Sequence, residues 1–208
     1  MSWSKKEDGR GYHHGNLREA LIGAVLDLIA EKGPAGATFA EAARRAGVSP
    51  AAPYRHFRDR DELLAATAAA GFERFAEALR AGWDQGRPAP QAAFERLGRA
   101  YLEFARSQPS YYLAMFESGL APEAHPGLQR AGDAAFGVLR EAAEALVATL
   151  PAAGRPPALM VALHVWAMAH GIAALFARPD GARRKTPIPP EDLLEAGFLV
   201  YLKGLGAP

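Results

Sequence analysis

Apolar residues recur at a spacing of three and four along most of this chain, and that spacing is the strongest constraint on its fold. In residues 17–32, for example, Leu17, Leu21, Val25 and Leu28 fall on one face, while charged residues occupy the others. Segments with this period end at stretches rich in Gly and Pro, and β-branched alternating runs do not occur. The pattern predicts an all-α protein.

The segments between these breaks predict about nine helices. Two of them begin with a capping box, in which Thr38 precedes Glu41 and Asp59 precedes Glu62. Ser49 is expected to cap the third helix, with Pro50 at its first position. The expected helices span about residues 17–32, 39–46, 50–56, 60–83, 91–107, 109–116, 128–149, 157–177 and 190–204.

Several classes of function lack the residues they need. The chain has no cysteine, which excludes disulfides, thiolate zinc sites and cysteine nucleophiles, and which fits a reducing compartment. It shows no nucleophile elbow, phosphate-cradling glycine loop or metal-ligand spacing, so we expect no catalytic residues, no metal and no cofactor. The amino terminus lacks the apolar core of a signal peptide. The apolar stretch 158–177 contains His164 and His170, so we expect a buried helix there and not a membrane span.

Positive charge is concentrated at the amino-terminal end. Residues 1–60 hold 10 Lys and Arg against 7 Asp and Glu, whereas residues 61–208 hold 14 against 16. A modest basic excess at one end is expected if that end meets a polyanion such as DNA.

Residues 38–57 have the spacing of a helix-turn-helix. Two short predicted helices are joined by a tight turn at Gly47-Val48-Ser49, where glycine tolerates a positive φ, and the small Ala43 allows the helices to cross closely. A small helical bundle with no affinity for DNA has the same spacing, so spacing alone leaves both interpretations open.

Pro53 disturbs the second of these helices. As the fourth helical residue it cannot donate to the Ser49 carbonyl, and it biases Ala52 away from helical geometry. We expect a short helix with an irregular or 3₁₀-like first turn, in which Pro53 fills a small apolar gap against the preceding helix.

The stretch TFAEAARRAGVSPAAPYRHFRDRDELL resembles the DNA-binding domain of the TetR family of bacterial repressors. The resemblance extends over residues 17–64. Two later stretches, YLEFARSQPSYYLAMF and WAMAHGIAALF, are similar to a TetR subgroup whose carboxy-terminal domain carries a Trp followed by His-Gly.

The resemblance implies DNA contacts at particular residues. Thr38, Tyr54 and His56 are expected to touch backbone phosphates, and Arg60 stands where the family usually has a phosphate-binding lysine. Arg58 is a further basic residue close by. Ala51 and Ala52 lack hydrogen-bonding groups but let the helix enter the major groove, where a methyl group can meet a thymine methyl. The remaining candidates on this surface are Arg44, Arg45, Ser49 and Arg55.

Three regions are expected. Residues 1–14 form a flexible basic arm whose Lys5, Lys6, Arg10, His13 and His14 either follow the DNA backbone or belong to an unattached terminus. Residues 15–60 form the helix-turn-helix domain, and residues 61–208 form a helical domain for effector binding and dimerisation.

In this family the carboxy-terminal domain binds a small molecule between helices. His170, Tyr111 and Tyr112 could supply polar anchors in an otherwise apolar pocket, although aromatic residues at helical spacing also serve simply as core. Gly171 inside an apolar helix is expected to allow close approach of another helix or a ligand. The expected pocket residues are Tyr101, Phe104, Tyr111, Tyr112, Met115, Phe116, Trp166, His170 and Phe176.

The last two long helices are expected to form a four-helix interface in a homodimer. The resemblance then implies a cytoplasmic repressor that binds a roughly palindromic double-stranded operator and is released by a partly apolar small molecule. The alternatives are a non-specific DNA-coating protein of the same fold and, less consistent with the residues, a small helical enzyme.

Overall fold

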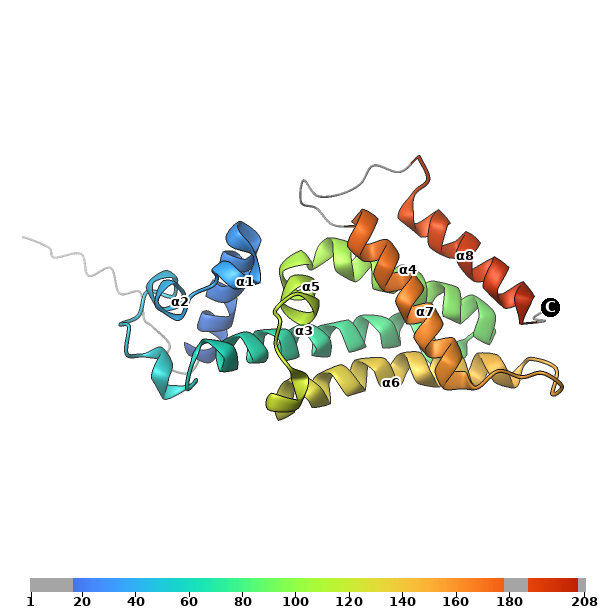
Figure 1. The fold of residues 1–208 in the computed structure, drawn as a ribbon, viewed down its shortest axis with the longest axis horizontal. Coiled ribbons are helices and arrows are strands. Elements are labelled where there is room, and N and C mark those ends of the chain that lie inside the picture. The colour runs from blue at the N-terminus through green and yellow to red at the C-terminus, as the bar shows by residue number, and fades with distance from the viewer. Residues whose placement is uncertain (1–16, 178–186, 206–208) are drawn as a thin grey trace, which may run out of the picture.

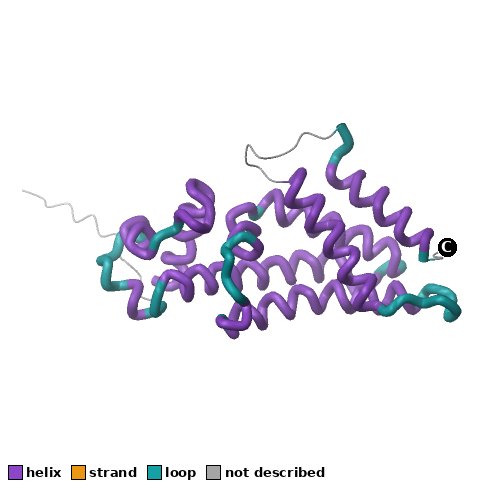
Figure 2. Tube along the Cα trace, viewed as in Figure 1, coloured by secondary structure: helices purple, strands orange, loops and turns teal. Residues whose placement is uncertain are grey.

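The computed structural model describes residues 17–177 and 187–205, and this part of the chain is helical without strands (Figures 1 and 2). The basic arm predicted for residues 1–14 lies outside the described residues. The α-helices are α1 (Leu17–Gly36), α2 (Phe39–Arg45), α3 (Arg60–Trp83), α4 (Pro90–Ser107), α5 (Pro109–Phe116), α6 (Pro126–Ala148), α7 (Ala158–Ile172) and α8 (Pro190–Gly204). The all-α prediction is confirmed.

The predicted third helix is replaced by a 3₁₀ turn, η1 (Pro53–Arg55), so the described residues contain eight α-helices and not nine. The cause is Pro53, whose nitrogen has no hydrogen to give to the Ser49 carbonyl. That carbonyl instead accepts from the Ala52 N–H at 3.0 Å. Ser49 is therefore not the helix cap we expected, because Ala52 takes the cap position without a side-chain hydrogen bond.

Both predicted N-caps are present at the start of their helices, although neither Glu41 nor Glu62 accepts the N–H of its capping residue as a full capping box requires. The Thr38 hydroxyl accepts from the Glu41 N–H at 3.2 Å, and the Asp59 carboxylate accepts from the Glu62 N–H at 2.8 Å. Glu62 in turn accepts from the Arg58 N–H at 2.7 Å. These bonds satisfy backbone donors that the helices leave open and so fix where α2 and α3 begin.

Two hydrophobic cores lie along the molecule, and α3 contributes to both. Leu63, Leu64 and Ala68 pack with α1 and α2, whereas Phe75 and Leu79 pack with α4 to α8. Figure 1 shows α1 and α2 at one end, with α3 and α6 side by side along the body and α7 and α8 across its outer side. The change of core falls within α3, several residues beyond the division expected at residue 60.

The helix predicted over residues 158–177 is only partly covered within the single chain. Residues Ala158–Phe176 are long and apolar enough to cross a membrane by length and composition, and 28% of that window is buried within the chain. Leu159, Met160 and Leu163 are exposed on α7, which continues into a π-helical turn, η4 (Ala173–Ala177). Apolar composition suggests that a helix is covered, but it does not say what covers it.

We expected Gly171 to allow another helix to come close, but within this chain the close contacts between helices occur at other glycines. A Cβ at Gly171 would have nothing within 4 Å, whereas a Cβ at Gly98 on α4 would lie 2.6 Å from Phe198 Cε2 on α8. At Gly197 a Cβ would lie 2.7 Å from Met168 Sδ on α7. Thus Gly98 and Gly197, and not Gly171, allow α8 to approach its neighbours within this chain.

Candidate DNA-binding surface and ligand cavity

The 3₁₀ turn divides its residues between core and solvent. Pro53 and Phe57 are buried, while Tyr54, Arg55 and His56 between them are exposed. Tyr54 is 64% exposed, and its ring meets the edge of Phe39 on α2 at a centroid distance of 4.8 Å. The aromatic pair ties the turn to the start of α2 and leaves the Tyr54 hydroxyl available to an outside partner.

Other predicted DNA contacts are also on the surface. Thr38, Arg44, Ser49 and Ala51 are exposed, and Ala52 is half-buried. The Thr38 hydroxyl donates to the Glu41 carboxylate at 2.9 Å, and Glu41 also pairs with Lys32. A phosphate at Thr38 would therefore have to replace a carboxylate as the acceptor of that hydroxyl.

Arg45 and Arg60 have partners inside the protein, which the sequence did not indicate. Arg45 makes two hydrogen bonds to the Glu31 carboxylate, at 2.7 and 2.8 Å, and this contact lowers the pKa of Glu31. Arg60 donates to the carbonyls of Ala37 and Pro34, both at 2.7 Å. Arg45 thus joins α2 to α1, and Arg60 holds the end of α1 and the residue that follows it against the start of α3.

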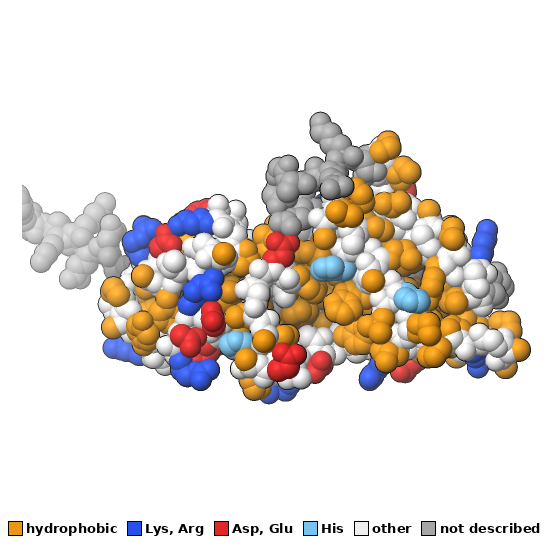
Figure 3. Space-filling view, viewed as in Figure 1, with side chains coloured by type: hydrophobic (Ala, Val, Ile, Leu, Met, Phe, Trp, Pro, Cys, Tyr) orange, Lys and Arg blue, Asp and Glu red, His pale blue; other side chains and the backbone are white. Residues whose placement is uncertain are grey.

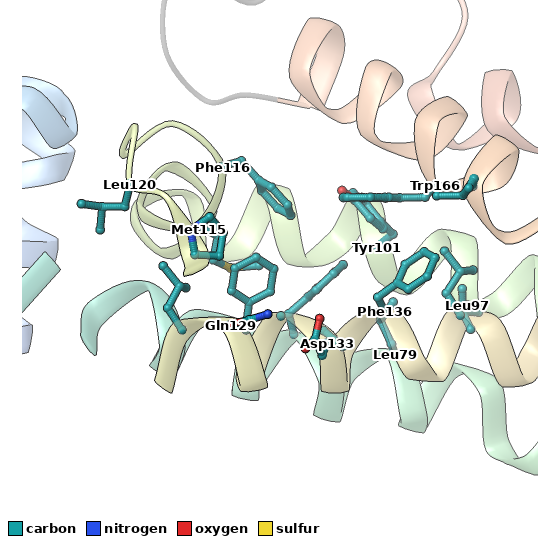
Figure 4. Close-up of a pocket in the computed structure, with 18 residues that line it drawn as sticks. Leu79, Leu97, Tyr101, Met115, Phe116, Leu120, Gln129, Asp133, Phe136 and Trp166 are labelled. Atoms are coloured by element: carbon teal, nitrogen blue, oxygen red, sulfur yellow. The ribbon is translucent and has the colours of Figure 1, made fainter. Parts of the chain in front are cut away.

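A cavity of about 440 Å³ lies between α3, α4, α5, α6 and α7. This volume is within the range of roughly 300–1,000 Å³ typical of small-molecule sites. Figure 4 shows Trp166 reaching in from α7, Phe116 from α5 and Tyr101 from α4, above Gln129 and Asp133 on α6.

Of the predicted pocket residues, the structure places Tyr101, Met115, Phe116 and Trp166 on the cavity wall. The others lie behind or beside the wall. Phe104 packs on Phe75 with a centroid distance of 5.0 Å, the Tyr111 ring lies under Arg74, and Phe176 packs against the core.

Tyr112 and His170 belong to a polar cluster with Tyr101. His170 Nδ1 lies 3.0 Å from the Tyr101 hydroxyl and 2.9 Å from the Tyr112 hydroxyl. Burial raises the pKa of Tyr101 and lowers the pKa of His170, so both groups are neutral at physiological pH. A neutral imidazole whose Nδ1 carries no hydrogen accepts from a tyrosine hydroxyl, and the cluster orients Tyr101 on the cavity wall.

The sequence did not indicate the cavity residues on α3 and α6. Phe72 and Phe75 are apolar residues of the kind that fills a core, and Gln129 and Asp133 are polar residues of the kind found on a solvated helix face. Only Phe136, an aromatic residue on an alanine-rich helix, could have drawn attention to α6.

An exposed helix-turn-helix at one end and a ligand-sized cavity in a helical body define a class of DNA-binding regulators. Comparison with known families agrees with this class. Residues 21–67 match the model described as bacterial regulatory proteins, tetR family, and residues 94–198 match the tetracyclin repressor-like C-terminal domain. The chain belongs to the TetR family of transcriptional regulators. Members of this family bind DNA operators as dimers together with small-molecule effectors, and they are regulators and not typically enzymes.

Individual relatives are similar over different lengths. The HTH-type transcriptional regulator BetI of Rhizobium meliloti (strain 1021) is 44% identical over 50 residues, which is 24% of this chain and 25% of BetI. A solved structure of a protein of unknown function from Rhodococcus sp. RHA1 is 33% identical, with a TM-score of 0.76 over 94% of this chain and 98% of that one. The TetR family regulator PfmR from Thermus thermophilus has a TM-score of 0.68 at 21% identity, over 89% of this chain and 98% of that one, which shows a shared fold.

Proposed function

We propose that this regulator is a cytoplasmic, homodimeric repressor that binds a roughly palindromic operator and leaves it when a small molecule occupies the cavity. Residues 15–60 bind DNA, and residues 61–208 bind the effector and the second subunit.

The observation that carries this proposal is the position of Leu128 at the start of α6. Leu128 lines the cavity, yet its side chain is 4% exposed and packs in the core of the DNA-binding end with Ala114 of α5. Leu120, in the loop before α6, also lines the cavity and packs against the same core. A ligand that displaces these leucines therefore acts on side chains that support α1, which links the cavity to the helix-turn-helix.

The DNA contacts divide into two groups. Thr38, Tyr54 and His56 bind phosphates and position the protein, whereas Arg44 and Arg55 are the charged candidates for groove contacts. Ser49, Ala51 and Ala52 lie at the head of the turn, where their small side chains allow close approach to the bases. Arg45 and Arg60 keep their partners in the protein and hold this surface in shape.

The test is a titration of the full chain on its own upstream DNA and on a scrambled duplex, at two salt concentrations. A repressor prefers its operator well above a salt-sensitive background. Equal affinity for both duplexes would indicate a DNA-coating protein, and turnover of a ligand would indicate an enzyme.

The same titration tests the role of Tyr54. Removal of a phosphate contact in Tyr54→Phe should weaken binding to operator and scrambled DNA alike, by about tenfold. The variant keeps the ring that packs on Phe39 and removes only the hydroxyl. Tyr54→Ala should weaken binding further, because the turn also loses that packing. Relaxed preference at a single base pair, with unchanged affinity for scrambled DNA, would instead assign Tyr54 to a base.

The dimer surface proposed here is formed by α7 and α8. His164 Nδ1 lies 3.1 Å from the Tyr201 hydroxyl, which joins the two helices, and exposed apolar side chains extend over both. Figure 3 shows hydrophobic side chains across this part of the molecule, whereas charged side chains gather at the end with α1 and α2. An apolar surface of this kind is typical of a subunit interface.

Val200→Glu should convert the dimer into monomers. Val200 on α8 is 74% exposed in the single chain, so the glutamate is tolerated there but would bury two like charges at a two-fold interface. We expect the dissociation constant to rise by about a hundredfold, measured by sedimentation equilibrium. Ala134→Glu, at an exposed position on α6, is the matched control. A dimer as stable as the parent would place the interface elsewhere.

A further inference from the structure

The described side chains that line the cavity carry a negative charge and no positive one. Among the described residues that line it, Asp133 is the only charged one, and no lysine or arginine is present. Asp133 is exposed on α6, and it makes no ion pair within the described part of the chain, although Arg130 lies three residues earlier on the same helix. The carboxylate at the mouth is therefore available to a ligand.

Aromatic rings dominate the interior of the same cavity. They come from five helices and surround a space in which Tyr101, held by His170, is the main polar group on the far wall (Figure 4). A space lined by rings accepts the apolar body of a ligand, and a cation that lies close to a ring face gains a further attraction. The rings are Phe72, Phe75, Tyr101, Phe116, Phe136 and Trp166.

We propose that the effector of this regulator is an apolar organic cation, with its body among the aromatic rings and its ammonium group beside Asp133. This inference rests on the proposed function, in which the cavity binds the effector. An anion of the same size, such as a carboxylate with an apolar tail, has no cation to pair with among the described lining residues and is repelled by Asp133. Burial of an unpaired anion carries a desolvation penalty that an apolar wall does not offset.

The charge preference can be measured with three probes that share one phenylbutyl body. These are 4-phenylbutyltrimethylammonium, 4-phenylbutan-1-ol and 4-phenylbutanoate. Each is titrated against the full chain loaded with N-phenyl-1-naphthylamine, a neutral dye that fluoresces in apolar cavities, and its displacement of the dye is recorded. We expect the ammonium probe to bind about tenfold more tightly than the alcohol, and the carboxylate to bind most weakly.

Two substitutions on α6 separate a local charge from the net charge of the protein. Asp133→Asn should reduce the advantage of the ammonium probe over the alcohol by about tenfold and leave the alcohol unchanged. Glu144→Gln removes the same charge eleven residues further along the helix, about 16 Å away, and should leave the order of the probes unchanged. Asp133→Lys should make the carboxylate the preferred probe.

The outcomes separate this inference from the proposed function. If all three probes displace the dye equally, or if Asp133→Asn leaves their order intact, the cavity binds ligands but the assignment to a cation is wrong. If the dye binds and none of the probes displaces it, the assignment to a cation is again wrong. If the dye itself does not bind, the cavity is not a ligand site, and the proposed function fails together with the inference.

Discussion

Gly98→Val is expected to lower the melting temperature of the protein by about 10 °C, because it separates α8 from α4. A Cβ at Gly98 would lie 2.6 Å from Phe198 Cε2 and 3.1 Å from Leu194 Cδ2. Both of these side chains are 2% exposed, and Phe198 also packs on Phe94 with a centroid distance of 5.7 Å. Because the ring is buried and already packed on Phe94, overpacking here costs about 3 kcal/mol of unfolding free energy.

Gly171→Ala is the matched control for this substitution. It also replaces a helical glycine, but its new Cβ has nothing within 4 Å. Alanine favours the helix by about 1 kcal/mol over glycine, so this variant should melt at the same temperature as the parent or slightly higher. Thermal unfolding followed by circular dichroism compares the two. If Gly98→Val melted with the parent, α8 could not lie against α4 as described.

Gly98→Val should also weaken the dimer, since α8 carries part of the proposed interface. Sedimentation at a temperature where the monomer is still folded separates this effect from global unfolding. A dimer that survives in the variant would assign the interface mainly to α7.

Ala135→Phe is expected to abolish the response to ligand while leaving affinity for the operator intact. Ala135 is 1% exposed and lines the cavity from α6, so a phenyl ring at this position occupies the ligand volume. A cavity of about 440 Å³ has room for the ring, so the stability of the protein should change little. Affinity for N-phenyl-1-naphthylamine should fall by about a hundredfold.

The neighbouring residue provides the control for this cavity. Ala134 is exposed on α6 and does not line the cavity, so Ala134→Phe adds the same ring to the same helix outside it. Operator binding should match the parent in both variants, whereas dye fluorescence should fall only in Ala135→Phe. If Ala135→Phe bound the dye as tightly as the parent, the dye would bind elsewhere, and the cavity would not be the effector site.

Local sequence predicted the beginnings of α2 and α3 because capping depends on residues three apart. Thr38 and Asp59 each accept a hydrogen bond from the backbone N–H three residues on, as their spacing indicates. The effect of Pro53 was predicted in kind but underestimated in extent, since one missing N–H converted a helix into a three-residue 3₁₀ turn. That turn still exposes Tyr54, Arg55 and His56, so its surface follows from the sequence although its helix does not.

The cavity could be predicted only in part. Tyr101, Met115, Phe116 and Trp166 line it, whereas Phe104 and Tyr112 are core residues of the same composition. Nothing along the chain distinguishes the two groups, because the difference depends on which way each helix faces its neighbours. Asp133 was missed for the related reason that an exposed carboxylate on a helix resembles any solvated residue.

The sequence by itself determined the all-α class, the caps of α2 and α3 and the family, all of which depend on residues a few positions apart or on a contiguous motif. The tertiary structure decided which glycine admits a neighbouring helix and which aromatic rings face a cavity. It also decided that Arg45 is held by Glu31 and that Arg60 is held by the carbonyls of Pro34 and Ala37. These properties are set by distances between helices far apart in the chain, and such distances leave no local pattern in the sequence.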